Sequence, residues 1–328
     1  MKTFLKNNII LLLLLLLPLV FLFCISIGTK FINPFNIDFS NPVSMSIMKL
    51  RFYRIITSFT VGGALAVSGA GYQAVLRNPL AEPFILGISG GASMGAALAI
   101  ITGLAAISYI ALPFASFVGA VIVLALVLVM ARGAGIEYTN NIMLSGVIAG
   151  TVCSSILMFI ISSSSSHELN SIAWWMLGNL QPHGEKLMIT VLSITLVGTF
   201  ILFMFGRETN LISMGEETAH SLGVNPYFII LLVLGLSSLM AASSVALSGI
   251  IGFVGLIIPH ILRKLSGADH RKLFPAALLA GGIFVMLCDS LARTVLSPVE
   301  IPVGIITSLT GGPFFLYILN KRKKFSNE

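Results

Sequence analysis

The sequence predicts an all-α membrane protein with about ten transmembrane helices, and three observations point to this fold class. Only 9% of the 328 residues are charged and 56% are hydrophobic, whereas a soluble globular protein carries roughly a quarter charged residues. The mean hydropathy is +1.01. Apolar runs of about 20 residues, the length with which a helix crosses a bilayer, recur along the whole chain. We therefore expect residues 1–328 to form a single transmembrane domain.

The candidate membrane-spanning segments follow one another along the chain. They cover approximately residues 8–28, 54–76, 84–103, 112–131, 139–161, 187–205, 229–248, 250–262, 273–293 and 303–319. The first resembles a signal peptide, but it lacks a clear small-residue cleavage site and is long enough to be a retained span. The eighth is too short to cross alone. Gly249, Gly252 and Gly255 indicate a broken helix there, which other parts of the protein must cover.

Residues 162–186 are expected to form a loop on the outer side of the membrane. Within this loop, segment 172–180 is apolar but too short to span a bilayer. It contains Trp174 and Trp175, and indole rings prefer the boundary between membrane and water. We therefore expect a short interfacial helix in this loop.

The basic residues predict the orientation of the chain. With the N-terminus inside, most of the 19 Lys and Arg residues are cytoplasmic, namely Lys2, Lys6, Arg77, Arg132, Arg207, Arg263, Lys264, Arg271, Lys272, Lys321, Arg322, Lys323 and Lys324. Because cytoplasmic loops are enriched in Lys and Arg, we expect both termini inside and an even number of spans. The net charge of +7 is spread between apolar runs rather than gathered on one face, so it does not indicate nucleic-acid binding.

A weak internal repeat links the two halves of the sequence. At one constant spacing, Ala66, Ser68, Gly69, Leu76, Pro79 and Gly87 recur as Ala246, Ser248, Gly249, Leu256, Pro259 and Gly267. Since Gly, Ala and Leu are common in this chain, a chance similarity stays open. In the orientation above, the first copy begins in an inward span and the second in an outward span, so the repeat is inverted, as in many transporters. Small residues such as Gly62 and Gly281 predict closely approaching helices.

Residues 206–228 form the most polar segment between two apolar runs. Its charged and titratable residues include Arg207, Glu208, Glu216, Glu217 and His220. A bilayer core does not tolerate this density of charge. Ala219, Leu222 and Gly223 complete the pattern of a short amphipathic helix that ends at a glycine, with Asn225–Pro226 before the next span. The segment is either a solvated loop or a cytoplasmic surface on which a soluble partner acts.

No catalytic set is predicted. The chain has no G-x-x-x-x-G-K-[ST] phosphate loop, so it does not hydrolyse nucleotide by that route. Each of Cys24, Cys153 and Cys288 stands alone in an apolar run, so neither a disulfide framework nor a metal cluster is indicated. Asp289 is the candidate for an ionisable residue within the membrane, and Arg293 four residues later predicts a neutralised pair in one helix. Energy for any transport is therefore expected from a partner.

Three arginines on the predicted outer side run against the positive-inside bias: Arg51, Arg54 and Arg293. Two interpretations stay open. The residues are membrane anchors whose charged ends reach the interface, or they form an outward-facing cluster that binds carboxylates of an incoming partner, because Arg pairs with carboxylates through two parallel hydrogen bonds.

Four long motifs resemble one family. They are RNPLAEPFILGISGGAS (77–93), SGIIGFVGLIIPHILRKLSGADHRKLFP (248–275), CDSLAR (288–293) and EIPVGIITSLTGGPFFLYIL (300–319). Together they resemble the FecCD-type permease subunit of bacterial ATP-driven importers of iron–siderophore chelates, haem and vitamin B12. The resemblance extends from about Arg51 to Leu319. It implies a second permease subunit, identical or different, two cytoplasmic ATPase subunits, an extracytoplasmic substrate-binding protein, and a location in the bacterial cytoplasmic membrane.

The same resemblance implies roles for particular residues. Residues 214–224 are similar to the family's coupling loop, which fits a groove of the ATPase. The positions concerned are Gly215, Glu216, Glu217, Ala219 and Gly223. Arg51, Arg54 and Arg293 match outer arginines that face acidic residues of the binding protein. Thr139 and Asn140 match the region of the cytoplasmic gate, although the flanking IEYTNN departs from relatives.

From these observations we expect a permease that forms a path for a metal chelate, with an iron(III)–siderophore as the first choice and haem or cobalamin as alternatives. The resemblance implies that ATP and Mg²⁺ bind to the partner ATPase, so this chain is not expected to be an enzyme or to carry a cofactor. Two rival interpretations remain. A self-contained secondary transporter is favoured by the inverted repeat alone, and a membrane scaffold without a transport role is the third possibility.

Overall fold

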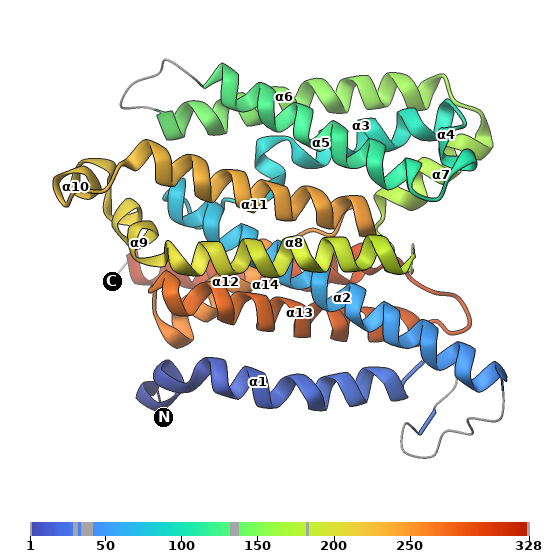
Figure 1. Cartoon of the computed structure of the whole chain (residues 1–328), viewed down its shortest axis with the longest axis horizontal. Helices are drawn as coiled ribbons and strands as arrows, with labels where there is room; N and C mark the ends of the chain where they lie inside the picture. The colour runs from blue at the N-terminus through green and yellow to red at the C-terminus, as the bar shows by residue number, and fades with distance from the viewer. Residues whose placement is uncertain (1, 29–31, 34–41, 132–137, 182–183, 327–328) are drawn as a thin grey trace.

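The computed structural model describes residues 2–28, 32–33, 42–131, 138–181 and 184–326. Within these ranges the chain is helical or irregular and contains no β-strand. In chain order the elements are α1 (Lys2–Ser26), α2 (Pro42–Val75), the 3-10 helix η1 (Pro83–Leu86), α3 (Ile88–Ile101), α4 (Leu104–Ile107), α5 (Ala111–Met130), α6 (Tyr138–Ser162), α7 (Ser166–Met176), α8 (Glu185–Met204), α9 (Gly206–Met214), α10 (Glu216–Ser221), α11 (Pro226–Ser248), α12 (Val254–Ser266), α13 (His270–Thr294) and α14 (Val303–Ser326). The long helices lie side by side in an elongated bundle (Figure 1).

Seven helices in the described part of the chain are long and apolar enough to cross a membrane. They are α1 from Asn8 onward, α2, α5, α6, α8, α11 and α13. The other three predicted segments fall on shorter helices, which are α3, α12 and the apolar first half of α14. The prediction of an all-α polytopic membrane protein is therefore confirmed.

The predicted break near residues 250–262 is also confirmed. Gly249 ends α11 with a positive φ of 68°, and the chain returns to a helix only at Val254. The resulting α12 has 13 residues, which is too short to cross a bilayer. The outer loop contains the expected short helix, but α7 begins before the predicted 172–180. Ser165 and Glu168 form a capping box that starts the helix there.

The central helix of the bundle is α2. It packs against α13, α11, α12 and α8, and its residues from Thr60 to Val75 are all buried. Gly62 brings α2 very close to α13, because a Cβ added there would lie 2.2 Å from the carbonyl oxygen of Gly281. The predicted close approach of helices at small residues is thus confirmed.

α2 and α11 run in opposite directions, and each is followed by an irregular segment and a shorter helix (Figure 1). This is the arrangement that an inverted repeat requires. The two helices also bind each other through buried polar groups. The Ser68 hydroxyl donates a 2.7 Å hydrogen bond to the Ser237 carbonyl, and the Tyr72 hydroxyl contacts that of Ser238. The buried hydroxyl groups of Ser68 and Tyr72 are thereby satisfied at the contact with α11.

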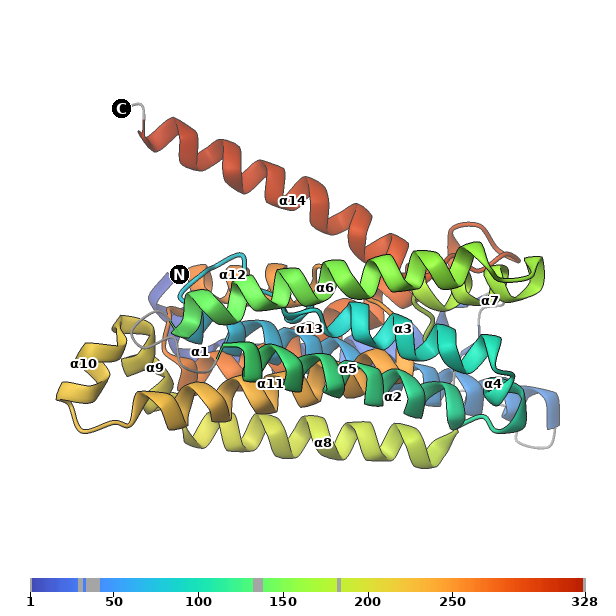
Figure 2. The ribbon, with the colours of Figure 1, turned by 90° about the horizontal axis from the view of Figure 1, so that it is seen from above.

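α3, α5 and α6 form one side of the bundle (Figure 1). α6 packs mainly against α3, α5 and η1. Its other face exposes apolar side chains, including Leu144, Val152 and Phe159. Seen from above, α14 diverges from the bundle toward the C-terminus (Figure 2). α6 is therefore a peripheral helix of this chain, whereas α2 and α13 are central.

Candidate functional site

Residues 206–228 lie at one end of the bundle, where they form α9 and α10 (Figure 1). Gly215 separates the two helices with a positive φ of 130°, and Gly223 follows α10 with a φ of 81°. The Asn225 side chain accepts a hydrogen bond of 3.2 Å from a backbone N–H in the first turn of α11. The predicted short helix, its terminating glycine and the Asn–Pro boundary are confirmed. The helix α9 was not predicted.

α10 has an inward and an outward face. Ala219 is completely buried, and the side chain of Glu216 is 25% exposed. Glu217 and His220 are exposed to the outside of the bundle, and Leu222 just after the helix is 62% exposed. The outward face therefore presents a carboxylate and a large apolar side chain together.

α9 is fixed to the start of α13 by the side chain of Asn210. Its amide donates a 2.9 Å hydrogen bond to the Asp269 carboxylate, and its carbonyl oxygen accepts one of 2.9 Å from the backbone N–H of His270. Asp269 also accepts a 3.0 Å hydrogen bond from the Arg271 guanidinium. The bonds from Arg271 outweigh the effect of burial and hold the pKa of Asp269 at about 2. The ionised Asp269 carboxylate therefore links α9 to the start of α13.

Glu216 joins three helices at this end of the bundle. The Thr139 hydroxyl at the start of α6 donates a 3.2 Å hydrogen bond to the Glu216 carboxylate. The Arg77 guanidinium, just after α2, lies 3.5 Å from the same oxygen. Thr139 is buried, whereas Asn140 beside it is exposed. The structure thus brings together Glu216 and Thr139, which the sequence placed in separate groups, and it adds Arg77, which stood in the 77–93 motif without an assigned role.

The end of the bundle that is predicted to face outward contains a buried charge network. Asp289 accepts hydrogen bonds from Arg54 at 2.9 Å and lies 3.0 Å from Arg293. Arg54 also binds Glu300 at 2.8 Å. The predicted pair of Asp289 and Arg293 within one helix is confirmed, and Arg54 from α2 adds a second cation to it. Glu300 was missed, and the signal that could have identified it is an acidic residue at the start of the 300–319 motif.

All three outer arginines are at least nine-tenths buried. Arg51 donates hydrogen bonds of 2.9 and 3.1 Å to the carbonyl oxygens of Ile25 and Ser26 at the end of α1. Arg54 and Arg293 are turned toward carboxylates of their own chain. In this structure the guanidinium groups therefore hold helices together, and docking of a binding protein on them stays a prediction.

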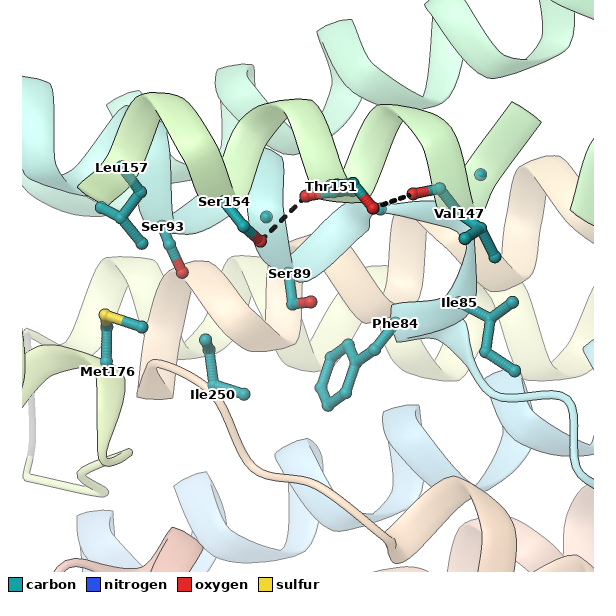
Figure 3. A pocket seen from close by; sticks show the side chains of 14 residues that line it. Phe84, Ile85, Ser89, Ser93, Val147, Thr151, Ser154, Leu157, Met176 and Ile250 are labelled. Atoms are coloured by element: carbon teal, nitrogen blue, oxygen red, sulfur yellow. Dashed lines mark hydrogen bonds between the residues drawn. The ribbon is translucent and has the colours of Figure 1, made fainter. Parts of the chain in front are cut away.

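A cavity of about 460 Å³ lies between α6 and the beginning of α3 (Figure 3). Apolar side chains on its wall include Phe84 of η1, Met176 of α7 and Ile250 of the broken segment before α12. Its hydroxyl groups belong to Ser89, Ser93, Thr151 and Ser154. Figure 3 shows these side chains from separate parts of the chain converging on one space. Among the described residues, none with a charged side chain lines the cavity.

The glycines of the 77–93 motif explain how α6 and α3 meet at this cavity. A Cβ at Gly146 of α6 would lie 2.6 Å from the carbonyl oxygen of Ile85, and one at Gly90 would lie 3.0 Å from the Cβ of Cys153. Gly90 of this stretch and Gly146 of α6 thus serve helix packing. In the described part of the chain, no group of His, Cys, Asp and Glu side chains could hold a metal ion.

A model of the FecCD transport family matches residues 12–321. The chain belongs to the FecCD transport family. The cobalamin import system permease protein BtuC of Halobacterium salinarum is 40% identical over 276 residues, which cover 84% of this chain and 73% of that protein. The hemin transport system permease protein HmuU of Yersinia pestis is 34% identical over 280 residues, covering 84% of each. A solved inward-facing structure of a metal-chelate type ABC transporter superposes with a TM-score of 0.86 at 33% identity and covers 96% of this chain and 99% of that one.

Family membership establishes the class of this FecCD protein. It is the membrane permease of an ATP-binding-cassette importer for metal chelates, and it lies in the cytoplasmic membrane. Members of the family are transport subunits, and a separate ATPase hydrolyses ATP. Because the relatives above are named for different cargoes, membership does not identify the chelate.

Proposed function

We propose that the cargo is an iron(III)–siderophore chelate with a neutral surface. The observation that carries this proposal is the wall of the cavity, which offers hydroxyl and apolar groups without any charge. A bare metal ion needs carboxylate, imidazole or thiolate ligands, and the propionates of haem need cationic or strong hydrogen-bonding partners when they leave water. A hydroxamate siderophore keeps its metal wrapped and presents amide and apolar groups, which a neutral wall suits.

Cobalamin is the second candidate. Its metal is also enclosed, and its amide-covered surface suits hydroxyl groups for the same reason. The 40% identity to a permease named for cobalamin import favours it specifically. Haem is the third candidate, supported by the relative from Yersinia pestis.

We assign the cavity to one wall of the translocation path. It lies where α6 meets two interrupted parts of the bundle, one at η1 and the other at Ile250, and transporters commonly bind substrate at interrupted helices. The exposed apolar face of α6 adjoins the cavity. A second permease subunit, identical or different, is proposed to cover this face and to supply the opposite wall, because large exposed apolar patches mark interaction sites.

We assign the outward face of α10 to the contact with the ATPase. Glu217 and Leu222 are exposed there and offer charge and apolar area to a groove. Gly215, Gly223 and the buried Ala219 set the shape and seating of the helix. ATP and Mg²⁺ are bound by the ATPase, and this chain needs no cofactor of its own.

On the outer side, the binding protein is proposed to dock over the charge network. Arg54 and Glu300 line a cavity of about 300 Å³ together with Trp174 and Gln181. Arg51 binds the end of α1, and Arg293 pairs with Asp289 of its own helix α13. Both contacts are proposed to stabilise this site. At the other end, Thr139 and Asn140 are proposed to form part of the cytoplasmic gate, with the exposed Asn140 facing the exit.

Uptake into proteoliposomes tests the cargo and the class together. The permease, its copurifying ATPase and its binding protein are reconstituted, and ATP-dependent uptake of ferrichrome, haemin and cyanocobalamin is compared. We expect uptake of ferrichrome alone, and uptake of cyanocobalamin alone would establish the second candidate. Transport by the permease alone, driven by a proton or sodium gradient without ATP, would refute the class.

A further inference from the structure

The segment that contains α10 touches the start of α6 at two points, although the two are far apart in the sequence. The hydroxyl of Thr139 donates a hydrogen bond of 3.2 Å to the carboxylate of Glu216. The aromatic rings of Tyr138 and Tyr227 lie 5.6 Å apart. Glu216 begins α10, and Tyr227 lies in the first turn of α11. The start of α6 therefore contacts the chain both at the beginning of α10 and after its end.

Arg77 brings the end of α2 to the same carboxylate. Arg77 has a positive φ of 47°, a conformation that is uncommon for a residue other than glycine. The next residue, Asn78, precedes Pro79, and this position disfavours a helical conformation. The Arg77 guanidinium lies 3.5 Å from Glu216. A Cβ added at Gly215 would lie 3.9 Å from the same guanidinium. Glu216 thus lies at the meeting point of α2, α6 and α10.

The geometry separates Glu216 from its neighbour Glu217. Glu217 is exposed on the outward face, whereas Glu216 is turned toward the bundle, where its hydrogen-bond partners are Thr139 of α6 and Arg77 in the segment after α2. Thr139 is only 4% exposed, so water competes weakly for its hydroxyl. The contact is therefore suited to transmit force between α10 and α6.

A force on α6 would reach the candidate translocation path, because α6 forms part of the cavity wall. This helix runs without interruption for 25 residues from Tyr138, and further along it provides Gly146, Thr151 and Ser154 to the wall of the cavity. Its neighbours in this chain are mainly α3, α5 and η1. A displacement at its first turn therefore moves one wall of the cavity.

We propose that Glu216 is a positioning residue that transmits movement of α10 to α6 through Thr139 and so links the ATPase cycle to the width of the cavity. This inference rests on the proposed contact of α10 with the ATPase. Arg77 orients the carboxylate, and the two tyrosines keep the first turn of α6 against the same segment.

Distance measurements in the intact complex test this link. Spin labels are placed at Asn140→Cys on α6 and Leu265→Cys on α12, both exposed positions. The native Cys24, Cys153 and Cys288 are buried and stay unlabelled. The permease with its copurifying ATPase is measured without nucleotide and with Mg-ATP plus vanadate. We expect a nucleotide-dependent change in distance in the otherwise native protein.

Variants at the two ends of the hydrogen bond decide the role of Glu216. Thr139→Val and Glu216→Ala should each abolish the distance change, the double variant should behave like either single one, and Thr139→Ser should retain the change. Thr190→Val is the matched control, because the Thr190 hydroxyl bonds the carbonyl of Lys186 in its own helix; it should behave as the native protein does.

Two results would overturn the inference while leaving the proposed function intact. One is a full distance change in Thr139→Val within an intact complex. The other is loss of the ATPase from Thr139→Val, because the hydroxyl would then serve assembly rather than transmission. Failure of the native permease to bind any ATPase would instead refute the proposed contact of α10.

Discussion

Replacing Asp289 with Asn tests what holds the outer charge network together. The Asp289 side chain is 1% exposed and lies 2.9 Å from Arg54 and 3.0 Å from Arg293. Asn has the same shape but no negative charge. Arg54 keeps its contact with Glu300 at 2.8 Å, whereas the other hydrogen-bond partners of Arg293 are the neutral carbonyl oxygens of Asp289 and Cys24 and the Ser290 hydroxyl. The substitution therefore leaves one buried guanidinium without a carboxylate beside it.

The expected cost follows from this geometry. Removing one partner of a buried ion pair costs about 3–5 kcal/mol, and the retained bond between Arg54 and Glu300 favours the lower end, so we expect about 3 kcal/mol. The matched control is Glu300→Gln. The Glu300 side chain is 38% exposed, and an ion pair this accessible to water contributes only about 1 kcal/mol or less.

Unfolding of the detergent-solubilised permease, followed by the fluorescence of Trp174 and Trp175, measures both variants. The order of the two effects is the decisive observation. If Asp289→Asn costs no more than Glu300→Gln, the buried network does not hold α2 against α13, and the arginines are left available for a docking partner.

Three further predictions follow from the packing and the charges. Gly281→Ala should destabilise the protein by about 1–3 kcal/mol through overpacking, because its Cβ would lie 2.3 Å from the carbonyl oxygen of Gly62, while Gly235→Ala, with nothing within 4 Å, should be neutral or stabilising in the same unfolding assay. Leu222 is exposed in the free chain and would be buried in the proposed contact, so Leu222→Glu should weaken copurification of the ATPase by about tenfold or more through loss of that apolar burial, with an unchanged unfolding curve; unchanged copurification would remove this face from the contact. The pKa of Asp269 is about 2 in the folded protein against an ordinary value of 3.8, so its stabilising contribution should be complete above about pH 4 and lost as the pH falls toward 2. Below pH 4, Asp269→Asn should therefore show a shallower loss of thermal stability than the native protein, and parallel curves would contradict the assignment.

The parts of the fold that depend on local pattern could be predicted from the sequence. Runs of apolar residues located the long helices, because a bilayer demands a fixed length of continuous apolar helix. The spacing of Asp289 and Arg293 predicted their pairing, since residues four apart share one face of a helix. Gly223 predicted the end of α10 because a helix commonly ends at a residue with positive φ.

The parts that depend on packing between distant segments could not be predicted. The inward direction of Arg54 is decided by Asp289 and Glu300, which come from the other half of the chain. The contact of Glu216 with Thr139 requires the start of α6 and the start of α10 to lie side by side in the folded chain. No local sequence spacing encodes that arrangement. The cavity likewise draws its lining from η1, α3, α6, α7 and the break before α12.

The two helices of segment 206–228, α9 and α10, differ in what they are attached to. α9 is clamped to α13 by the bonds of Asn210, and α13 is itself packed backbone to backbone against α2 at Gly281. α10 follows after Gly215, whose φ of 130° disfavours any side chain, and it contacts α6 through Glu216. A force applied to the exposed face of α10 therefore meets the fixed α13 on one side of Gly215, and on the other side the peripheral α6 and the half-exposed Arg77 side chain after α2. Because the central helices are locked, the displacement passes to α6 and to the cavity wall that α6 forms.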